Sequence, residues 1–390
     1  MKKPTMLLLW IGAAISISEI FTGGLTVPLG LVKGGAAIVI GHLIGVSLLS
    51  FGGYISFSRG ENAMGAVARS FGGVGGKIVA FCNVVQLIGW TVVMTVQAGG
   101  AITSVLPRLP FAPVAFALSA LVLVWALLLG SPAVRLNNFA VLLLILMCAA
   151  LFGEALGGVG AAPAAPTSGA MSFALAVELS IAMPVSWLPL IGDYTVSAND
   201  RSCACVIPFA GYFTGSTLMY LFGLFIAVFA GGDIFSFVAG SRFRYIACGV
   251  VLLSTLTTAF LDLYSAAESS GRILGAKSKY GPIIAAGVLA AIISAVFPIE
   301  LYSSFLEQFL TSIGMVFVPV YTIIFLDFIM SEPSVDKALR IDKLIIAAAG
   351  MVAYNRFAGY GVGIPTVMSI LFVAVFYTLY SIAAKKGASI

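Results

Sequence analysis

Hydrophobic residues gather in long runs along the whole chain, and short breaks rich in charged residues, glycine or proline separate these runs. An α-helix needs about 20 consecutive apolar residues to cross the hydrocarbon core of a bilayer. The runs therefore predict an all-α membrane protein with twelve transmembrane helices. The expected spans lie near residues 7–31, 34–57, 78–105, 112–130, 136–157, 172–197, 205–230, 245–271, 281–299, 303–330, 342–358 and 364–384.

The composition excludes a water-soluble globule. Hydrophobic residues make up 61% of the 390 positions and charged residues only 9%, whereas soluble domains carry roughly 25% charged residues. Twelve helices of about 21 residues would use about 250 positions, which leaves no room for a separate soluble domain. Because the net charge of +5 rests on few side chains, we interpret it as a sign of membrane orientation and expect no nucleic acid partner.

The basic residues favour one side of the predicted membrane. With a cytoplasmic N-terminus, fifteen fall inside: Lys2, Lys3, Arg59, Arg69, Lys77, Arg135, Arg201, Arg272, Lys277, Lys279, Lys337, Arg340, Lys343, Lys385 and Lys386. Five fall outside: Lys33, Arg108, Arg242, Arg244 and Arg356. Since cytoplasmic loops carry an excess of Lys and Arg, we expect a multi-pass protein of the cell (inner or plasma) membrane with both termini in the cytoplasm.

Small residues and thiols are expected to serve packing. Glycine pairs spaced by four residues allow helices in lipid to approach closely, and they occur at Gly41/Gly45, Gly153/Gly157 and Gly211/Gly215. The five cysteines lie in or beside apolar runs, and the single histidine, His42, is far from the Cys203/Cys205 pair. This pattern predicts neither a disulfide framework nor a zinc site, and we expect no cofactor.

Two spans contain helix breakers at mid-depth. The first carries Glu19, the pair Gly23-Gly24 and Pro28, and the sixth carries Pro184 and Pro189. Proline removes a backbone donor, and the freed polar groups must face protein or a cavity rather than lipid. We therefore expect both spans to be broken helices.

The two predicted breaks hold corresponding places in two five-helix sets, at 7–157 and 172–330. Interrupted helices in matching positions of two halves are typical of inverted-repeat transporters, which bind substrate and coupling ion at the breaks. We expect a first repeat at 1–157, a second at 158–330 and two extra C-terminal helices at 331–390. The alternative is a pair of unrelated proline kinks.

Three acidic residues, Glu19, Glu178 and Asp262, are predicted well inside the bilayer. An ionisable group there costs at least about 2.5 kcal/mol, so each needs a partner, a proton or water. Glu19 and Asp262 lie among hydroxyl groups and helix breaks, which favours a functional role. Glu178 has the alternative role of bracing the broken helix.

Polar stripes mark two further spans. Residues Ser254, Thr258, Asp262 and Ser265 share one face of the eighth span, and hydroxyl oxygens beside unwound carbonyls suit a hard cation such as sodium. Alternatively, these hydroxyls bond to their own helix.

The third span places Asn83, Gln86, Trp90, Met94 and Gln97 on one face. Trp90 and Trp187, the latter at the predicted sixth-span break, could stack on an aromatic ring or pack in the core.

Enzyme motifs are lacking. Residues 71–77 look like a phosphate loop but begin with Phe71 instead of Gly, and Ile78 replaces the required Ser or Thr; we expect a flexible cytoplasmic connection there. The sequence contains no His-Glu-x-x-His or Gly-x-Ser-x-Gly pattern. An intramembrane enzyme is thus disfavoured. A channel is disfavoured too, because the polar residues cluster at mid-depth in few spans.

Four segments carry a resemblance to a known family: residues 10–13, 83–90, 186–195 and 257–265. They resemble the nucleobase:cation symporter-1 family, and within it the CytX branch of hydroxymethylpyrimidine transporters linked to thiamine biosynthesis. The resemblance extends over nearly the whole chain. The resemblance implies a leucine-transporter-type fold with five-plus-five inverted repeats and two extra C-terminal helices. It also implies symport of a flat nitrogen heterocycle, such as a cytosine, purine or hydantoin relative, with Na⁺ or H⁺.

The resemblance also implies site residues. The expected substrate-binding set is Glu19, Trp90, Met94, Trp187 and Asp262. The expected cation-binding set, with sodium as the possible metal, is Ile15, Ser18, Ser254, Thr257 and Thr258. Two departures change the chemistry: Met94 stands where the family has a ring-binding glutamine, and Trp187 lies about one turn from the usual aromatic.

Glu19 and Asp262 replace a glutamine and an asparagine of the family pattern. A carboxyl group can accept from an exocyclic amine and, when protonated, donate to a neighbouring ring nitrogen. Two acids in place of two amides therefore favour a basic aminopyrimidine, such as hydroxymethylpyrimidine, over neutral uracil or hydantoin.

Overall fold

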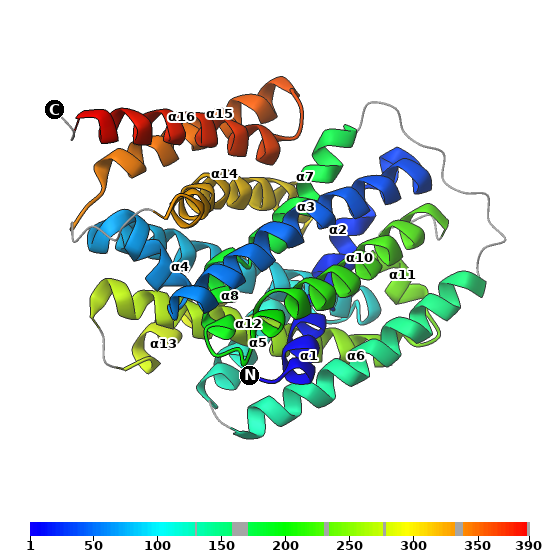
Figure 1. Cartoon of the computed structure of the whole chain (residues 1–390). Coiled ribbons are helices and arrows are strands. Elements are labelled where there is room, and N and C mark those ends of the chain that lie inside the picture. Colours follow the sequence, from blue (N-terminus) through cyan, green and yellow to red (C-terminus); the bar gives the residue numbers. More distant parts are fainter. Residues whose placement is uncertain (129–130, 158–170, 230–233, 276–277, 332–337, 388–390) are drawn as a thin grey trace.

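The computed structural model describes all residues except 129–130, 158–170, 230–233, 276–277, 332–337 and 388–390 (Figure 1). The described part is helical and contains no β-strand. Its 3-10 helices are η1 (Val27–Leu29) and η2 (Ile299–Leu301). Its α-helices are α1 (Lys3–Ala14), α2 (Ile17–Leu25), α3 (Gly30–Arg59), α4 (Ala63–Val105), α5 (Phe111–Leu127), α6 (Ser131–Gly157), α7 (Phe173–Val185), α8 (Leu188–Thr195), α9 (Arg201–Ala204), α10 (Val206–Phe229), α11 (Ile234–Gly240), α12 (Arg244–Leu274), α13 (Tyr280–Val296), α14 (Tyr302–Ile329), α15 (Ile341–Tyr360) and α16 (Pro365–Gly387).

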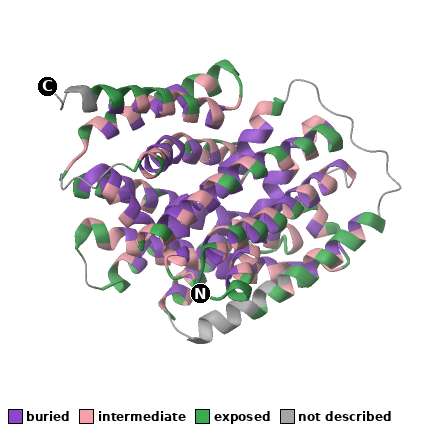
Figure 2. Cartoon of the chain, in the orientation of Figure 1, coloured by how far each residue is buried: buried purple, intermediate pink, exposed green. Residues whose placement is uncertain are grey.

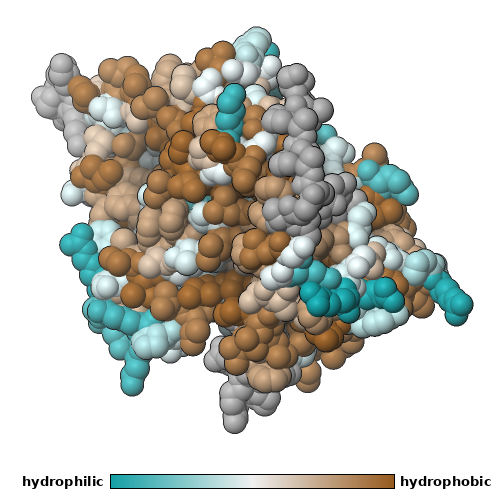
Figure 3. Space-filling view, turned by 90° about the vertical axis from the view of Figure 1, so that its right-hand side faces the viewer, coloured by the Kyte–Doolittle hydropathy of each residue, from teal (hydrophilic) through white to brown (hydrophobic). Residues whose placement is uncertain are grey.

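Several of these helices have the length and apolarity of membrane spans. Within the described residues seven meet both criteria, or eight if the bent pair α1 and α2 is counted as one span. Figure 3 shows a face covered largely by hydrophobic side chains, with hydrophilic residues gathered toward its edges. A multi-span membrane protein is therefore confirmed, while the expected number of twelve spans stays a prediction.

Two predicted boundaries are wrong. The α-helix of the first predicted span ends at Leu25 rather than near residue 31. Lys33, expected in an outside loop, lies in the first turn of α3. The chain turns at Gly30, whose φ of 70° is accessible mainly to glycine. Residues 71–77 are not a flexible connection but part of α4, which is kinked at Gly72 with φ 80°. Lys277 and Lys337 of the predicted cytoplasmic set, and the segment 158–170 after the first predicted repeat, lie outside the described residues.

The core forms where the two predicted breaks meet long helices. Figure 1 shows α3 and α10 side by side across the molecule, and Figure 2 shows that buried residues concentrate behind them, while α6, α15 and α16 at the periphery carry many exposed ones. The centre of the molecule is therefore made by α2, α4, α7, α8 and α12.

Glycines bring the central helices into close contact. A Cβ atom on Gly41 or Gly45 would lie 2.4 Å from the Ser180 side chain or 2.6 Å from Pro184 of α7. One on Gly215 would lie 2.8 Å from Ala14 of α1. The packing role predicted for these two pairs is confirmed, whereas no described neighbour comes within 4 Å of such an atom on Gly153 or Gly157.

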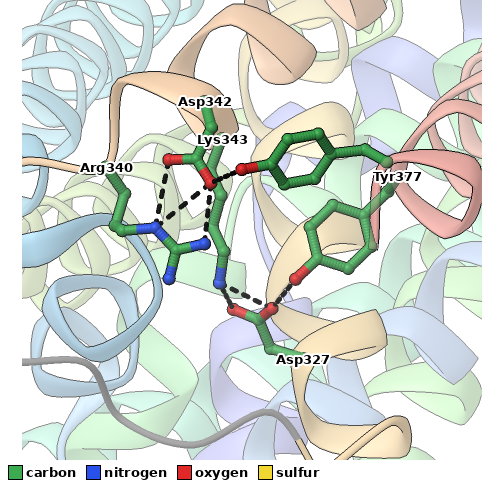
Figure 4. Close-up of polar contacts among 6 residues, drawn as sticks. Asp327, Arg340, Asp342, Lys343 and Tyr377 are labelled. Carbon is green, nitrogen blue, oxygen red and sulfur yellow. Dashed lines mark hydrogen bonds and ion pairs between the residues drawn. The ribbon is translucent and has the colours of Figure 1, made fainter. Parts of the chain in front are cut away.

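The two C-terminal helices are fastened by a buried ion pair. Lys343 of α15 lies 2.7 Å from both carboxylate oxygens of Asp327 on α14, and Tyr377 of α16 also donates to Asp327 (Figure 4). Beside it, Arg340 binds Asp342, which also accepts a hydrogen bond from Tyr380. This network joins three helices through charge-assisted hydrogen bonds.

Replacing Gly223 with alanine should destabilise the protein. The added Cβ would lie 1.7 Å from the carbonyl oxygen of Ile20, so α2 and α10 must separate. Overpacking of this kind costs about 1–3 kcal/mol. We expect G223A to melt at a lower temperature in detergent and the matched variant G153A to melt at or above the wild-type temperature. Equal melting of both variants would contradict the close crossing.

Removing one charge of the Asp327–Lys343 pair should lower the stability of the protein more than removing both charges. Asp327→Asn leaves the buried Lys343 ammonium without its counter-ion, which costs about 3–5 kcal/mol. The double variant D327L/K343M removes both charges and should recover most of the lost thermal stability. Wild-type melting of D327N, measured by scanning fluorimetry, would show that the pair is not buried.

Candidate functional site

The first apolar span is broken at Ile15 and Ser16. Both residues adopt extended dihedral angles, and α1 and α2 meet at an angle of 52°. The Ser16 hydroxyl accepts a hydrogen bond from the backbone N–H of Glu19 at 3.3 Å, which caps α2. A break in this span is confirmed, but its predicted position is wrong: it lies one turn before Glu19, and the Gly23-Gly24 pair lies inside α2.

The sixth apolar span was also expected to be a broken helix, but its interruption is only mild. Helix α7 ends at Val185 and α8 starts at Leu188, yet Ser186 and Trp187 between them keep near-helical dihedral angles. Phe173–Thr195 therefore counts as one apolar span. Pro184 inside α7 and Pro189 in the first turn of α8 account for the interrupted hydrogen bonding.

Polar side chains of α4 stabilise both interruptions. Gln97 accepts a hydrogen bond from the Ser18 hydroxyl at 2.7 Å and donates to the carbonyl of Ile17 at 3.3 Å. Eleven positions earlier, Gln86 donates to the carbonyl of Ser186 at 2.9 Å. Buried polar groups beside a break need such partners. The polar face predicted for the third span thus braces the two breaks.

A small cavity lies where these elements meet. All five residues predicted to bind substrate line it: Glu19, Trp90, Met94, Trp187 and Asp262. The other lining residues are Ala13, Ser16, Ser18, Leu87, Met183, Ser186 and Leu190. Its free volume is about 20 Å³, room for about one water molecule. A heterocycle can enter only when the walls move, because ligand clefts usually offer about 300 Å³ or more.

The cavity walls combine aromatic faces with polar atoms that have no partner among the described residues. Asp262 is buried and its Oδ2 lacks a hydrogen-bond partner there, as does the indole Nε1 of Trp90. Phe309 contacts Trp90 edge-on, with ring centroids 5.3 Å apart. Trp187 makes the same type of contact with Trp10 at 5.9 Å. Buried polar atoms are usually paired, so Asp262 and Trp90 are candidates to bind a polar ligand.

Glu19 has partners that the sequence did not reveal. Tyr212 of α10 donates to its Oε1 at 2.9 Å, and the Ser216 hydroxyl lies 2.6 Å from its Oε2. Ser216 in turn lies 2.6 Å from Nε2 of His42 on α3. Tyr212 and Ser216 are four residues apart on one face of α10, which is the only pattern that could have marked them. No sequence rule links that face to Glu19, almost 200 positions away.

Of the five predicted cation-binding residues, two line a cavity, and the other three are described by their hydrogen bonds or burial. Ile15 and Ser254 line a second cavity of about 40 Å³ beside the first-span break. The Ser18 carbonyl accepts from the Thr22 hydroxyl at 2.8 Å, and the Thr257 hydroxyl donates to the carbonyl of Leu253. Thr258 is buried on the same helix. Among the described residues, no group of three or more His, Cys, Asp or Glu side chains could hold a metal ion.

Glu178 lies away from the cavity, among the C-terminal helices. Its carboxylate accepts from the Tyr354 hydroxyl at 2.6 Å, from the Thr366 backbone at 2.8 Å and from the Thr366 hydroxyl at 2.5 Å. The bracing alternative considered for Glu178 therefore fits its contacts, which tie α7 to α15 and α16.

Relatives of known structure share this fold. The chain is similar to Mhp1, a nucleobase-cation-symport-1 family transporter, in a closed conformation with bromovinylhydantoin bound: the TM-score is 0.77 at 16% identity, covering 95% of this chain and 90% of that one. The inward-facing Mhp1 structure gives 0.77 at 15% identity, covering 98% and 90%. A mutant manganese transporter of Eremococcus coleocola gives 0.55 at 11%, covering 97% and 94%.

Sequence comparison points to the same group of transporters. The cytosine permeases of Escherichia coli O157:H7 and K12 are each 25% identical to the chain over 309 residues, which is 76% of this chain and 70% of each permease. Residues 4–339 match the family model described as permease for cytosine/purines, uracil, thiamine and allantoin. The match spans most of the sequence and confirms the family resemblance, so the chain belongs to this permease family.

Proposed function

We propose that the protein is a cation-coupled symporter that imports a small planar nitrogen heterocycle across the cell membrane. The proposed frame has twelve spans, with repeats at 1–157 and 158–330, two extra helices at 331–390, and both termini in the cytoplasm. The family supports nucleobase-type transport, and the cavity at the break between α1 and α2 supports the position of the substrate.

The observation that carries this proposal is the unpaired carboxylate oxygen of Asp262 beside Trp90. Asp262 Oδ2 and Trp90 Nε1 are buried and without partners among the described residues, and both residues line one cavity. A flat heterocycle supplies what they lack, because its rim carries N–H donors and ring acceptors while its faces stack on aromatic rings. Trp90 and Trp187 are the proposed aromatic walls, and Met94 the apolar one.

Within this class we propose an aminopyrimidine, with hydroxymethylpyrimidine or another thiamine precursor as the best candidate. Asp262 can accept from an exocyclic amine, and Glu19 lines the same cavity. A charge-assisted contact to a basic ring is stronger than an amide contact. The alternative substrate is cytosine, a purine or a hydantoin, which the names of the relatives favour.

The coupling cation is proposed to act close to this cavity. Sodium would bind near the small cavity of Ile15 and Ser254, where the break frees backbone groups. A proton would instead bind a carboxyl group of the substrate cavity. Uptake that saturates and shows counterflow, with substrate recovered unchanged, would distinguish either symporter from a channel or an enzyme.

Removing the Trp90 ring should weaken substrate binding. Loss of a stacking partner costs about 1–3 kcal/mol, so W90A should bind hydroxymethylpyrimidine or cytosine roughly 5- to 150-fold more weakly in equilibrium binding assays. The matched control is W125A, which removes a half-buried tryptophan of α5 outside the cavity lining. Equal affinity of W90A and wild type would refute the proposed position of the substrate.

Asp262→Asn should change specificity. The carboxylate is replaced by a neutral amide of the same shape, and a hydrogen bond to a charged group is worth about 1.5–3 kcal/mol. We expect affinity for hydroxymethylpyrimidine and cytosine to fall roughly 10- to 150-fold while affinity for uracil holds or rises, as measured by competition. A wild-type protein that binds only uracil would remove the aminopyrimidine proposal but leave the symporter proposal in place.

A further inference from the structure

Three buried side chains from three helices form one hydrogen-bonded chain. It runs from Glu19 on α2, at the substrate cavity, through Ser216 on α10 to His42 on α3. Both oxygen–oxygen and oxygen–nitrogen distances are 2.6 Å, and the exposed fractions of the three residues are 1%, 0% and 0%. Its inner end, His42, is the only histidine of the protein.

Counting hydrogens shows that the Glu19–Ser216–His42 chain holds one proton more than a carboxylate, a serine hydroxyl and a neutral imidazole would. Nδ1 of His42 lies 2.8 Å from the carbonyl oxygen of Ile38, which can only accept, so Nδ1 carries a hydrogen. Two gaps remain, from Nε2 to Ser216 and from Ser216 to Glu19, and each needs one hydrogen. The serine hydroxyl supplies one of them. The second must belong either to Glu19 as a carboxylic acid or to His42 as an imidazolium.

The two arrangements differ only in where the hydrogens sit. In the neutral form Glu19 Oε2 donates to Ser216, and Ser216 donates to Nε2 of His42. Transfer of the Glu19 proton to Ser216 Oγ, with transfer of the serine proton to Nε2, gives a carboxylate and an imidazolium. No atom leaves the chain and the net charge is unchanged. A dry interior favours the neutral form, and a basic substrate beside Glu19 favours the charged one.

No fixed positive charge lies among the described groups around the Glu19–Ser216–His42 hydrogen-bond chain. Tyr212 donates to Glu19 Oε1 at 2.9 Å, and Tyr220 contacts the His42 ring edge-on at 4.6 Å. Asp262 of α12 lines the same cavity as Glu19. Among the described residues, no Lys or Arg makes an ion pair or hydrogen bond with Glu19 or His42.

Two further acids on neighbouring helices are engaged elsewhere. Glu178 of α7, which packs against α3, is bound by Tyr354 and Thr366. Asp193 of α8 accepts from the backbone of Ala63, and Tyr194 packs against Trp10. The described residues therefore offer Glu19 no Lys or Arg counter-ion.

We propose that the Glu19–Ser216–His42 chain is the site of the coupling proton. The chain takes up one proton when the substrate cavity opens to the outside and releases it, through Glu19, when the cavity opens to the cytoplasm. His42 holds the proton while Glu19, as a carboxylate, binds a basic substrate. This inference rests on the proposed symport function and names its coupling ion.

The test measures substrate-driven proton entry into proteoliposomes without sodium, using an enclosed pH dye and cytosine or hydroxymethylpyrimidine as substrate. H42Q keeps a polar side chain that cannot hold a proton, and S216A interrupts the chain. We expect both to lower proton entry per substrate at least tenfold and to flatten the pH profile of uptake. The controls Y220F, beside His42, and S119A, a buried serine of α5, should keep wild-type coupling.

Binding and spectroscopy keep the outcome decisive. Thermal stabilisation by substrate in H42Q and S216A shows that they fold and bind. Should they misfold, infrared difference spectra of the wild type, with E19Q as reference, must show a protonated Glu19 that loses its acid C=O band on substrate binding. Wild-type proton entry in both folded variants, uptake that needs sodium and moves no proton, or no Glu19 acid band would each overturn the proposal. Absence of substrate uptake by the wild type would instead refute the symporter proposal.

Discussion

Every backbone amide and carbonyl at membrane depth must find a partner, because lipid offers none. The bend of 52° between α1 and α2 releases such groups in the middle of the bundle. Ser16 caps the start of α2, and Gln97 of α4 bonds both Ser18 and the Ile17 carbonyl. Those bonds hold α4 against the break and thereby bring Trp90, seven residues from Gln97, to the cavity wall. The proposed substrate cavity thus lies where α4 is held against the break.

Buried carboxyl groups show which parts of the molecule are structural. Asp327 is paired with Lys343, and both oxygens of Glu178 are bound by α15 and α16. Glu19 is held by α10 but still lines the cavity. Asp262 alone among these four has an oxygen without a partner in the described part of the chain. The C-terminal helices therefore brace the bundle through fully satisfied acids, and the one unpartnered oxygen of these four acids lies at the cavity wall.

Much of this arrangement follows from sequence because hydropathy and helical spacing are local. The positions of most helices, the existence of a break in the first span and the shared face of Gln86, Trp90 and Gln97 were predictable, and all five expected substrate residues meet at one cavity. The start of α3 was not predictable, because Gly30, at positive φ, turns the backbone inside an unbroken apolar run. The partners of Glu19 could not be predicted either. His42 and Ser216 come from helices whose contact depends on three-dimensional packing rather than on spacing.

The break in the first span and the interruption in the sixth are proposed to enclose a polar chamber that takes up the substrate. A single cysteine placed at Ser186, in a background without the five native cysteines, tests it by labelling with a water-soluble thiol reagent in membranes. We expect labelling at Ser186 as the cavity walls move and protection by an aminopyrimidine, while a cysteine at buried Ser119 of α5 stays unlabelled. Labelling at Ser186 that substrate leaves unchanged, or no labelling there under any condition, would contradict it.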